Sequence, residues 1–384
     1  IALLLAAVAA LVLTQYLRAW QAVPDSLART GDFAGTYAAS TLWRTGNAAS
    51  MYDVQSQESV LAATGTPSNH LYIPFENPPA AAVLASPFSL LDSATAYRAW
   101  SLLQLLMLVT AVVIAARAAP WPRTLRMQQV AASAVAMAGF GTYLLFIEGQ
   151  WDGPLVLALA IAYAGWRRGR HTMPGLLLGF AAAVAKPHLV IGIVAFMIGR
   201  RDWRGLACGA GGVAIAIALS LGFAGTGSTL AFAHALLQPS NSPVLYMQSA
   251  VGLTESWLGA GSVPFALGVM LSAAAAAAAG WCGARSRALP DHFEPLLAAA
   301  VTLSLLAAPH LLGHDLTLLA PMLVATLAWC AAREPRSWPG SATLAVLAAW
   351  VTLMLANRSD LGVAIQGPPG RLTPLALLLF AAVT

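Results

Sequence analysis

Charged side chains are scarce in this chain: Asp, Glu, Lys and Arg make up 9% of its 384 residues, whereas 59% are hydrophobic and the mean hydropathy is +0.71. Ordinary soluble domains carry roughly a quarter charged residues, so this shortage excludes that class. Apolar runs of about 20 residues recur, the length needed to cross a bilayer core of roughly 30 Å. We therefore predict an all-α, multi-pass membrane protein in which residues 1–384 form a single transmembrane domain.

Lysine is nearly absent, because Lys186 is the single copy among 20 basic residues. The arginines occur in short clusters between apolar runs, a pattern that orients membrane proteins, so the net charge of +5 does not indicate nucleic-acid binding. Cysteine is also rare: Cys208, Cys282 and Cys330 all lie in or beside apolar segments. We expect them to pack as small hydrophobic residues, which excludes a disulfide framework.

The arginine clusters define the expected topology, because positively charged loops stay on the cytoplasmic side. They occupy residues 117–126, 167–170, 200–204, 285–287 and 333–336. The apolar runs predict spans at 1–20, 94–116, 127–147, 153–166, 203–223, 262–282, 294–309, 314–331, 339–356 and 371–384. The chain opens inside an apolar run with no A-x-A-type cleavage site, so we interpret residues 1–20 as a first span rather than a signal peptide.

Two long segments, 21–78 and 224–261, are expected outside the membrane. Within them, residues 33–45, 228–238 and 244–258 mix aromatic and small polar residues, which is typical of helices lying in the membrane interface. A short apolar stretch at 79–91, which follows the extended Asn77-Pro78-Pro79 turn, is expected to dip into the membrane edge. Its groove suits an acyl or isoprenoid chain; a simple re-entry of the chain is the alternative.

Residues 172–199 do not fit a single crossing, because arginine clusters flank both ends and a Lys-Pro pair interrupts the middle. We predict a hairpin of two short helices with Lys186 at its tip. An arm of about 13 residues reaches about 20 Å at a rise of 1.5 Å per residue, which carries the tip toward the outer half of the membrane. Counting both arms gives about twelve transmembrane helices.

Ionisable side chains near the outer ends of the spans are the candidate functional residues, because a charge in hydrocarbon costs several kcal/mol. Asp32 follows the first span, where it suits the N-cap of the next helix and also a carboxylate placed where a membrane-bound substrate meets water; the two roles are compatible. The external turn "FIEGQWDGP" carries further polar groups, for which a structural role is the alternative. The candidates for the substrate pocket are Tyr37, Asn77, Glu148, Gln150, Asp152, Asp315 and Gln248.

The segment "AAPHLLGHDLTLLAP" brings His310, His314 and Asp315 together, and Pro309 and Gly313 make it a break between two spans. A zinc site built on H-x-x-x-H would need a glutamate next to the first histidine and a third ligand, and the sequence offers neither. We therefore expect no metal here. The histidines are better suited to donate hydrogen bonds to a sugar or a phosphate.

Lys186 and His188, in "VAKPHLV", form the most unusual motif. A lysine that snorkels to water is the plain alternative, but Lys186 is about 13 residues from either arginine flank, the wrong place for a short escape to the cytoplasm. An ammonium group is suited to phosphate oxygens, and a helix that starts after Pro187 adds backbone N–H donors. The tip therefore predicts an anion site, and a lipid phosphate is the anion expected at that depth.

These motifs occur in a recognisable order: an Asp after the first span, "TGNAASMYD", "PFENPPAAAVLASPFSLL", "EGQ", "AKPH" and "PHLLGHD". Over residues 30 to 320 that order resembles glycosyltransferase family 87, membrane mannosyltransferases of GT-C architecture. Members include enzymes that mannosylate phosphatidylinositol mannosides. The Asp-Glu pair expected in protein O-mannosyltransferases is lacking, because Asp32 is followed by Phe33.

The resemblance implies a polyprenyl-phosphate sugar donor, most often mannose, and a glycolipid or glycan acceptor. We expect no cofactor and no nucleic-acid partner. The resemblance also implies catalysis at the extracytoplasmic face of the bacterial plasma membrane. Asp32 matches the family's proposed catalytic base, Lys186 its intramembrane lysine, and His310 or His314 its late histidine. On this basis we expect inverting, metal-independent transfer, with Lys186, His188, His310 and His314 at the donor phosphate.

Three other readings remain open at this point. Another GT-C transferase, such as an arabinosyl- or glucosyltransferase or a lipid-linked glycan ligase, would use the same base and phosphate clamp. A secondary transporter would also have broken helices and intramembrane charges. A scaffold that only binds the lipid would carry the same residues without turnover.

Overall fold

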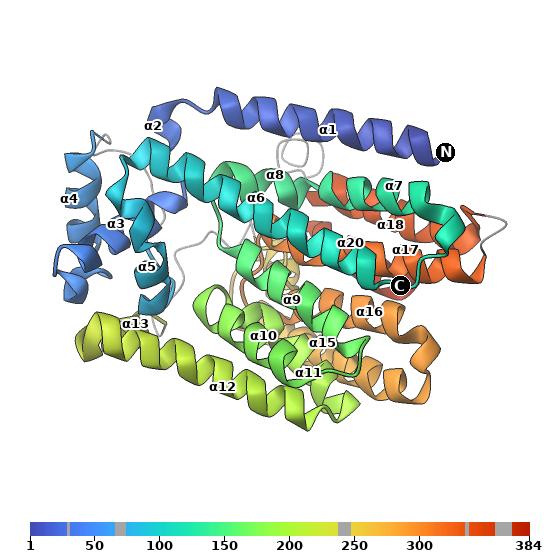
Figure 1. The fold of residues 1–384 in the computed structure, drawn as a ribbon. Helices are drawn as coiled ribbons and strands as arrows, with labels where there is room; N and C mark the ends of the chain where they lie inside the picture. The colour runs from blue at the N-terminus through green and yellow to red at the C-terminus, as the bar shows by residue number, and fades with distance from the viewer. Residues whose placement is uncertain (29–30, 66–73, 237–246, 335–337, 358–370) are drawn as a thin grey trace.

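The computed structural model describes residues 1–28, 31–65, 74–236, 247–334, 338–357 and 371–384, and these residues are helical with no strand. Most helices run alongside one another, and α2 to α5 and α13 gather at one end of the molecule (Figure 1). The elements are α1 (Ala2–Ala22), α2 (Asp25–Ala28), α3 (Phe33–Arg44), η1 (Ala48–Ser50), α4 (Val54–Ala63), α5 (Pro79–Ala85), η2 (Ser86–Leu90), α6 (Ser93–Ala118), η3 (Arg123–Leu125), α7 (Arg126–Met137), α8 (Phe140–Glu148), α9 (Asp152–Trp166), α10 (Thr172–Val184), η4 (Pro187–Val190), α11 (Ile191–Arg200), α12 (Trp203–Leu219), η5 (Ser220–Ala224), α13 (Gly225–Leu236), α14 (Ala250–Leu258), α15 (Ser262–Ala288), η7 (Pro290–His292), α16 (Phe293–Ala307), η8 (Gly313–Leu318), α17 (Leu319–Arg333), α18 (Ser341–Asn357) and α20 (Thr373–Val383).

The predicted all-α polytopic class is confirmed. Among the described residues, five helices are long and apolar enough to cross a membrane: Ala2–Ala22, Ser93–Ala118, Trp203–Ala235, Ser262–Ala288 and Gly313–Arg333. Six apolar helices of 10–17 residues accompany them, α10 and the α11 arm included. A total of about twelve spans remains a prediction, because it depends on how many of the shorter helices cross.

One predicted span is bent. We predict one span over residues 127–147, and the structure forms this stretch from α7 and α8, which meet at an angle of 53°. The break lies at Gly139, where an added Cβ would come within 2.9 Å of Trp350 Cζ2 and 3.1 Å of Met354 Sδ. Side chains of α18 therefore pack directly against the break, and sharp kinks commonly occur at such glycines.

The predicted hairpin is present as α10, η4 and α11, with Lys186 between the two arms. The arms are held by neighbours rather than by each other: α10 packs on α9 and α12, and α11 packs on α15 and α16. Gly175 near the start of α10 meets Gly205, which closely follows the end of α11, so both ends of the hairpin lie at the same end of the bundle. Small residues allow this close backbone approach between membrane helices.

The arginine clusters gather at that same end. Arg167 at the end of α9 pairs with Glu294 at 3.1 Å, and the guanidinium of Arg200 lies 4.4 Å from the ring centroid of Phe293. Arg333 donates to the carbonyl of Asp291 at 3.0 Å. These contacts join the ends of three helices to η7 and the first turn of α16. Lys186 is thereby one hairpin arm away from the arginine end, as the sequence predicted.

The segments expected outside the membrane differ from simple interfacial helices. Nine of the twelve residues of α3 are buried, so α3 is enclosed by protein rather than presenting one apolar face. The helical stretch that begins at Trp203 passes through a π-turn at Ser220–Ala224 and reaches Ala235 in α13, with Gly225 at φ 85° where α13 begins. Residues 66–73 and 237–246, which include Tyr246, lie outside the described residues.

We expect Gly179→Ala to destabilise the hairpin. The new Cβ would lie 2.1 Å from the carbonyl oxygen of Gly209 on α12, and overpacking of this kind costs about 1–3 kcal/mol. Gly211→Ala is the matched control, because its Cβ would meet only Leu176 Cδ1, at 3.7 Å. Thermal unfolding in detergent should show a lower midpoint for the first variant alone; equal midpoints would contradict the close packing of α10 on α12.

Candidate active site

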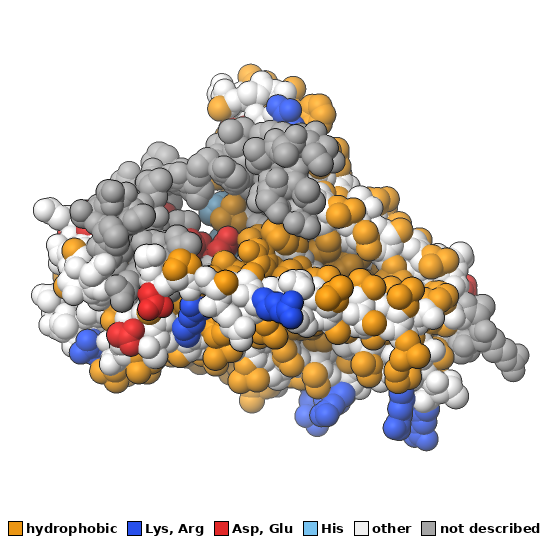
Figure 2. Space-filling view, turned by 90° about the horizontal axis from the view of Figure 1, so that it is seen from above, with side chains coloured by type: hydrophobic (Ala, Val, Ile, Leu, Met, Phe, Trp, Pro, Cys, Tyr) orange, Lys and Arg blue, Asp and Glu red, His pale blue; other side chains and the backbone are white. Residues whose placement is uncertain are grey.

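A cavity of about 450 Å³ lies among the turns at the end of the bundle opposite the arginine clusters. This volume falls in the range of small-molecule sites, about 300–1,000 Å³. Residues from the segments 32–36, 52–54, 74–78, 149–151, 185–188, 232–235 and 310–315 line it. Figure 2 shows acidic and histidine side chains inside a hollow, next to a broad hydrophobic surface.

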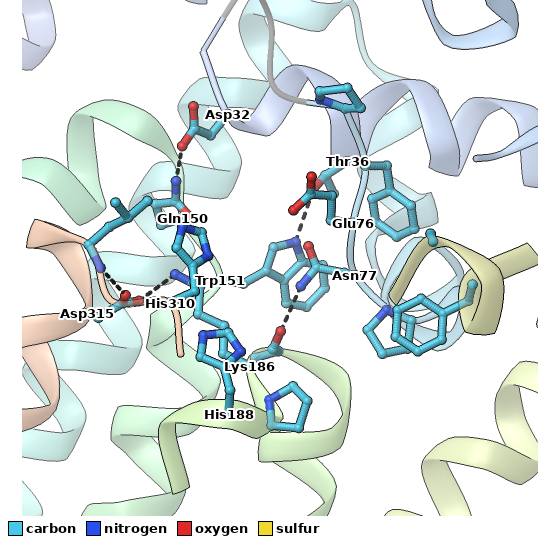
Figure 3. A pocket seen from close by; sticks show the side chains of 18 of the residues that line it. Asp32, Thr36, Glu76, Asn77, Gln150, Trp151, Lys186, His188, His310 and Asp315 are labelled. Carbon is cyan, nitrogen blue, oxygen red and sulfur yellow. Dashed lines mark hydrogen bonds and ion pairs between the residues drawn. The ribbon is translucent and has the colours of Figure 1, made fainter. Parts of the chain in front are cut away.

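Lys186 lies at the cavity wall within a dense set of ion pairs. Its Nζ is 2.6 Å from Asp315 Oδ1, 3.1 Å from Asp152 Oδ1 and 3.0 Å from His314 Nδ1 (Figure 3 shows the Asp315 pair). Both carboxylates are buried. Lys186, which we expect to bind an anion, is therefore already paired with two carboxylates. An ammonium at this depth needs such partners, because an unpaired charge there is costly.

His314 lies between the Lys186 ion pairs and the carboxylate of Glu148. Its Nδ1 lies 3.0 Å from Asp152 Oδ2 and 3.1 Å from Asp315 Oδ1, and its Nε2 lies 3.9 Å from Glu148 Oε2. The turn is fixed by the backbone N–H of Leu312, which donates to Asp315 Oδ2 at 2.7 Å. The predicted helix break is confirmed, because α16 ends at Ala307 and η8 starts at Gly313.

Asp32 shares the same cavity. It occupies the N-cap position of α3, as expected, but its side chain makes no capping hydrogen bond and accepts instead from Gln150 Nε2. Burial raises the pKa of Asp32, while the nearby His314 and Lys186 oppose that rise. A carboxylate that lines a cavity, accepts a hydrogen bond from an amide and has a raised pKa has the properties of a general base.

The sequence brings Gln150 to Asp32 through the turn after α8. Gly149 ends α8 in the left-handed region, at φ 70°, and its Cα faces Phe33, so that an added Cβ would lie 3.0 Å from Phe33 Cβ. Trp100 Nε1 donates to the Gly149 carbonyl at 2.7 Å, and Trp151 Nε1 donates to Thr36 Oγ1 at 3.0 Å. The turn is therefore clamped against the start of α3 on both sides of Gln150.

His188 and His310 face the cavity together, with ring centroids 6.0 Å apart. Burial lowers the pKa of His310, so its imidazole favours the neutral form. Neutral imidazoles donate one hydrogen bond each and add no positive charge. Asn77 reaches the hairpin tip as well, because its Nδ2 donates to the Ala185 carbonyl at 2.8 Å.

Four of the seven predicted pocket residues do not line the cavity: Tyr37, Glu148, Asp152 and Gln248. Glu148 and Asp152 contact His314, which does line it. Tyr37 is buried in α3 and donates from its hydroxyl to the Leu91 carbonyl at 2.9 Å. Gln248 is also buried; its side chain donates to Asn357 Oδ1 at 2.7 Å and its backbone N–H to the Leu311 carbonyl at 2.8 Å. Tyr37 and Gln248 support the framework around the site instead of contributing to its wall.

The sequence analysis missed several wall residues, of which Glu76 is the most notable. Figure 3 shows Glu76 and Asn77 across the cavity from Asp315 and His310. Tyr52, Trp151 and Phe232 also line the wall. The signal for Glu76 in the sequence is an acid in "PFENPP", at the outer end of the re-entrant stretch. The prolines of the same motif predict the backbone conformation but not where the Glu76 side chain lies.

Two sets of side chains have metal-ligand chemistry, each with ligand atoms within 4.8 Å of one another: Asp32 with Glu148 and His314, and Asp152 with His314 and Asp315. In the second set the Lys186 ammonium contacts all three members, so it already occupies the position of a cation. The expected independence from metals remains a prediction.

Comparison with known proteins gives one match. The sequence profile described as glycosyltransferase family 87 matches residues 75–309, more than half of the chain. No curated protein and no solved structure matches. The matched region contains Lys186, His188 and the turn from Glu148 to Asp152, whereas Asp32 and His314 lie outside it and join the site through the fold. The chain belongs to glycosyltransferase family 87 and is a membrane glycosyltransferase.

Proposed function

We propose that the protein transfers a sugar, mannose in the first instance, from a polyprenyl-phosphate carrier to a glycolipid or glycan acceptor. The single observation that carries the proposal is the shared cavity, in which Asp32 faces the phosphate-binding chemistry of Lys186, His188 and His310. A carrier of this kind brings its own leaving group, so a base and a phosphate site suffice. Neither a nucleotide nor a redox cofactor enters the reaction.

The proposed reaction is a displacement with inversion at the anomeric carbon. The acceptor hydroxyl oxygen forms the new glycosidic bond, and its proton passes to the Asp32 carboxylate. The bond between the anomeric carbon and the phosphate oxygen breaks, and polyprenyl phosphate leaves with the bonding electrons. The Gln150 amide keeps the Asp32 carboxylate oriented while it accepts the proton.

The departing phosphate gains negative charge, and positioned donors stabilise that charge best where water is excluded. His188 and His310 offer imidazole N–H groups at the cavity wall. Lys186 adds an ammonium whose pairing with Asp152 and Asp315 holds it in place. We assign the phosphate to these three side chains, with His314 acting through Lys186 and Asp152 rather than as a direct donor.

The proposed location is the extracytoplasmic side of a bacterial plasma membrane, with the polyprenyl chain in the surrounding lipid. This orientation is supported by the arginine clusters at the opposite end of the bundle, because positively charged loops stay cytoplasmic. The broad hydrophobic surface beside the hollow suits the isoprenoid tail of such a carrier (Figure 2).

A donor panel tests the proposal. Purified full-length protein in nanodiscs would receive polyprenyl-phosphate mannose, glucose or arabinose together with an alkyl glycoside acceptor, with EDTA in parallel. We expect transfer from the mannose carrier, unchanged by EDTA. Transfer from the glucose or arabinose carrier alone would show that mannose is not the donor sugar and would leave the proposed mechanism in place. Loss in EDTA with recovery on Mn²⁺ would assign Asp32, Glu148 and His314 to a metal, and no transfer from any carrier would refute the function.

A further inference from the structure

The cavity has a second end with a different chemistry. We call it the aromatic end and define it by Tyr52, Phe75, Glu76 and Phe232. The Tyr52 ring centroid lies 5.6 Å from that of Phe75 and 5.9 Å from that of Phe232, with the planes tilted by 37° in both pairs. No group in this set carries a positive charge, so the aromatic end is unlike the phosphate site.

The aromatic end is built as a firm platform. The Tyr52 hydroxyl donates to the Asn77 carbonyl at 2.6 Å, which fixes the ring. Phe75 is held by its backbone N–H, which donates to Gln57 Oε1 at 3.0 Å, and the buried Gln57 amide in turn donates to the Met51 carbonyl at 2.8 Å. A pre-organised platform loses little conformational entropy when a ligand binds.

Glu76 supplies the polar group of this end. It is exposed to the cavity, and with the other described residues its carboxylate forms no ion pair. Asn77, its neighbour, is anchored to the hairpin tip by the hydrogen bond to Ala185, so the backbone at Glu76 is fixed relative to Lys186. A carboxylate beside aromatic side chains that line the cavity matches a sugar, which has C–H faces for the rings and hydroxyl donors for the carboxylate.

We propose that the aromatic end binds the acceptor sugar and selects an uncharged one. The inference rests on the proposed function for its direction: in a displacement with inversion, nucleophile and leaving group stand on opposite sides of the reacting carbon. The phosphate donors lie at Lys186, His188 and His310, and the base is Asp32. Glu76 lies across the same cavity from His310 (Figure 3), so we place the ring of the acceptor sugar at Glu76 and its reacting hydroxyl at Asp32.

The charge of Glu76 sets the specificity. A neutral hexose can donate hydroxyl protons to the carboxylate, and such charge-assisted bonds are about twice as strong as neutral ones. An acceptor with a uronic acid or a phosphate at this position would meet a like charge, which discriminates against it. The acceptor class is therefore a neutral terminal sugar of a glycolipid or glycan.

The test compares two acceptors in nanodiscs with polyprenyl-phosphate mannose as donor: octyl mannoside, which is neutral, and octyl glucuronide, which is anionic. Glu76→Gln should raise the KM for octyl mannoside about tenfold and reduce its preference over the glucuronide, with a donor KM within about twofold. Phe232→Ala should raise the same KM about three- to tenfold. Glu58→Gln on α4 and Leu230→Ala on α13 are the matched controls, because both side chains are exposed and neither lines the cavity.

Unchanged acceptor KM in both variants, or equal changes in donor and acceptor KM, would overturn the inference while the proposed function stands. If the parent protein transfers no sugar from any carrier, saturation-transfer NMR with octyl mannoside decides the question separately. A saturation-transfer signal in the parent that disappears in Glu76→Gln would support acceptor binding at the aromatic end. Equal signals in both proteins would refute it.

Discussion

Replacing Asp32 with asparagine is expected to lower sugar transfer by about 10²- to 10⁴-fold, the contribution typical of a positioned general base. The amide has the same shape as the carboxylate and can still meet Gln150, but it cannot accept the proton of the acceptor hydroxyl. The loss should appear in kcat, with donor affinity nearly unchanged, because Asp32 acts on the acceptor. Initial rates with a radiolabelled carrier, together with direct lipid binding, measure both quantities.

The pH profile separates a base from a structural acid. Burial raises the pKa of Asp32, so activity should fall on acidification at a higher pH than an ordinary aspartate would give, because the base must be ionised. The residual activity of Asp32→Asn should lack that acid limb. Asp25→Asn, an exposed acid on α2, is the control and should behave like the parent. A parent-like rate in Asp32→Asn would exclude the base assignment.

The hairpin was predictable because its signals are local. Arginines on both flanks and the Lys186-Pro187 pair specify two short arms with a tip, and the helices end within a residue or two of the expected positions. The break between Pro309 and Gly313 was predictable for the same reason. Asp32 and Lys186 were assigned to one site by resemblance and by expected depth, and the cavity joins them.

The partners of Lys186 could not be read from the sequence. Asp152 follows α8 and Asp315 lies 163 positions later in the chain, and no spacing rule connects them; their ion pairs depend on how α9, α10 and η8 pack. Glu76 and Phe232 both line the cavity although they are 156 positions apart in the chain, which depends on how α13 packs near residues 48–52 and 75. Whether the Asp32 side chain caps α3 or meets Gln150 depends on its rotamer, which a residue pattern does not encode.

Replacing Lys186 with methionine is expected to abolish most activity for two reasons that can be separated. The change leaves Asp152 and Asp315 without their ammonium partner, and removing one member of a buried ion pair costs about 3–5 kcal/mol. It also removes a cation from the proposed phosphate site. Thermal unfolding in nanodiscs should therefore show a lower midpoint, and binding of polyprenyl phosphate, measured by native mass spectrometry, should weaken at least about tenfold.

A double variant distinguishes the two causes. Lys186→Met with Asp315→Asn removes one charge of each sign, and His314 remains to face Asp152, so much of the lost stability should return. If Lys186 binds the phosphate, affinity for polyprenyl phosphate stays low in this stable double variant. Asp315→Asn alone should show the opposite change, because it frees Lys186 from a competing anion and leaves phosphate binding equal or stronger. Recovery of both stability and lipid affinity in the double variant would make Lys186 a structural partner of the two carboxylates and leave the phosphate to His188 and His310.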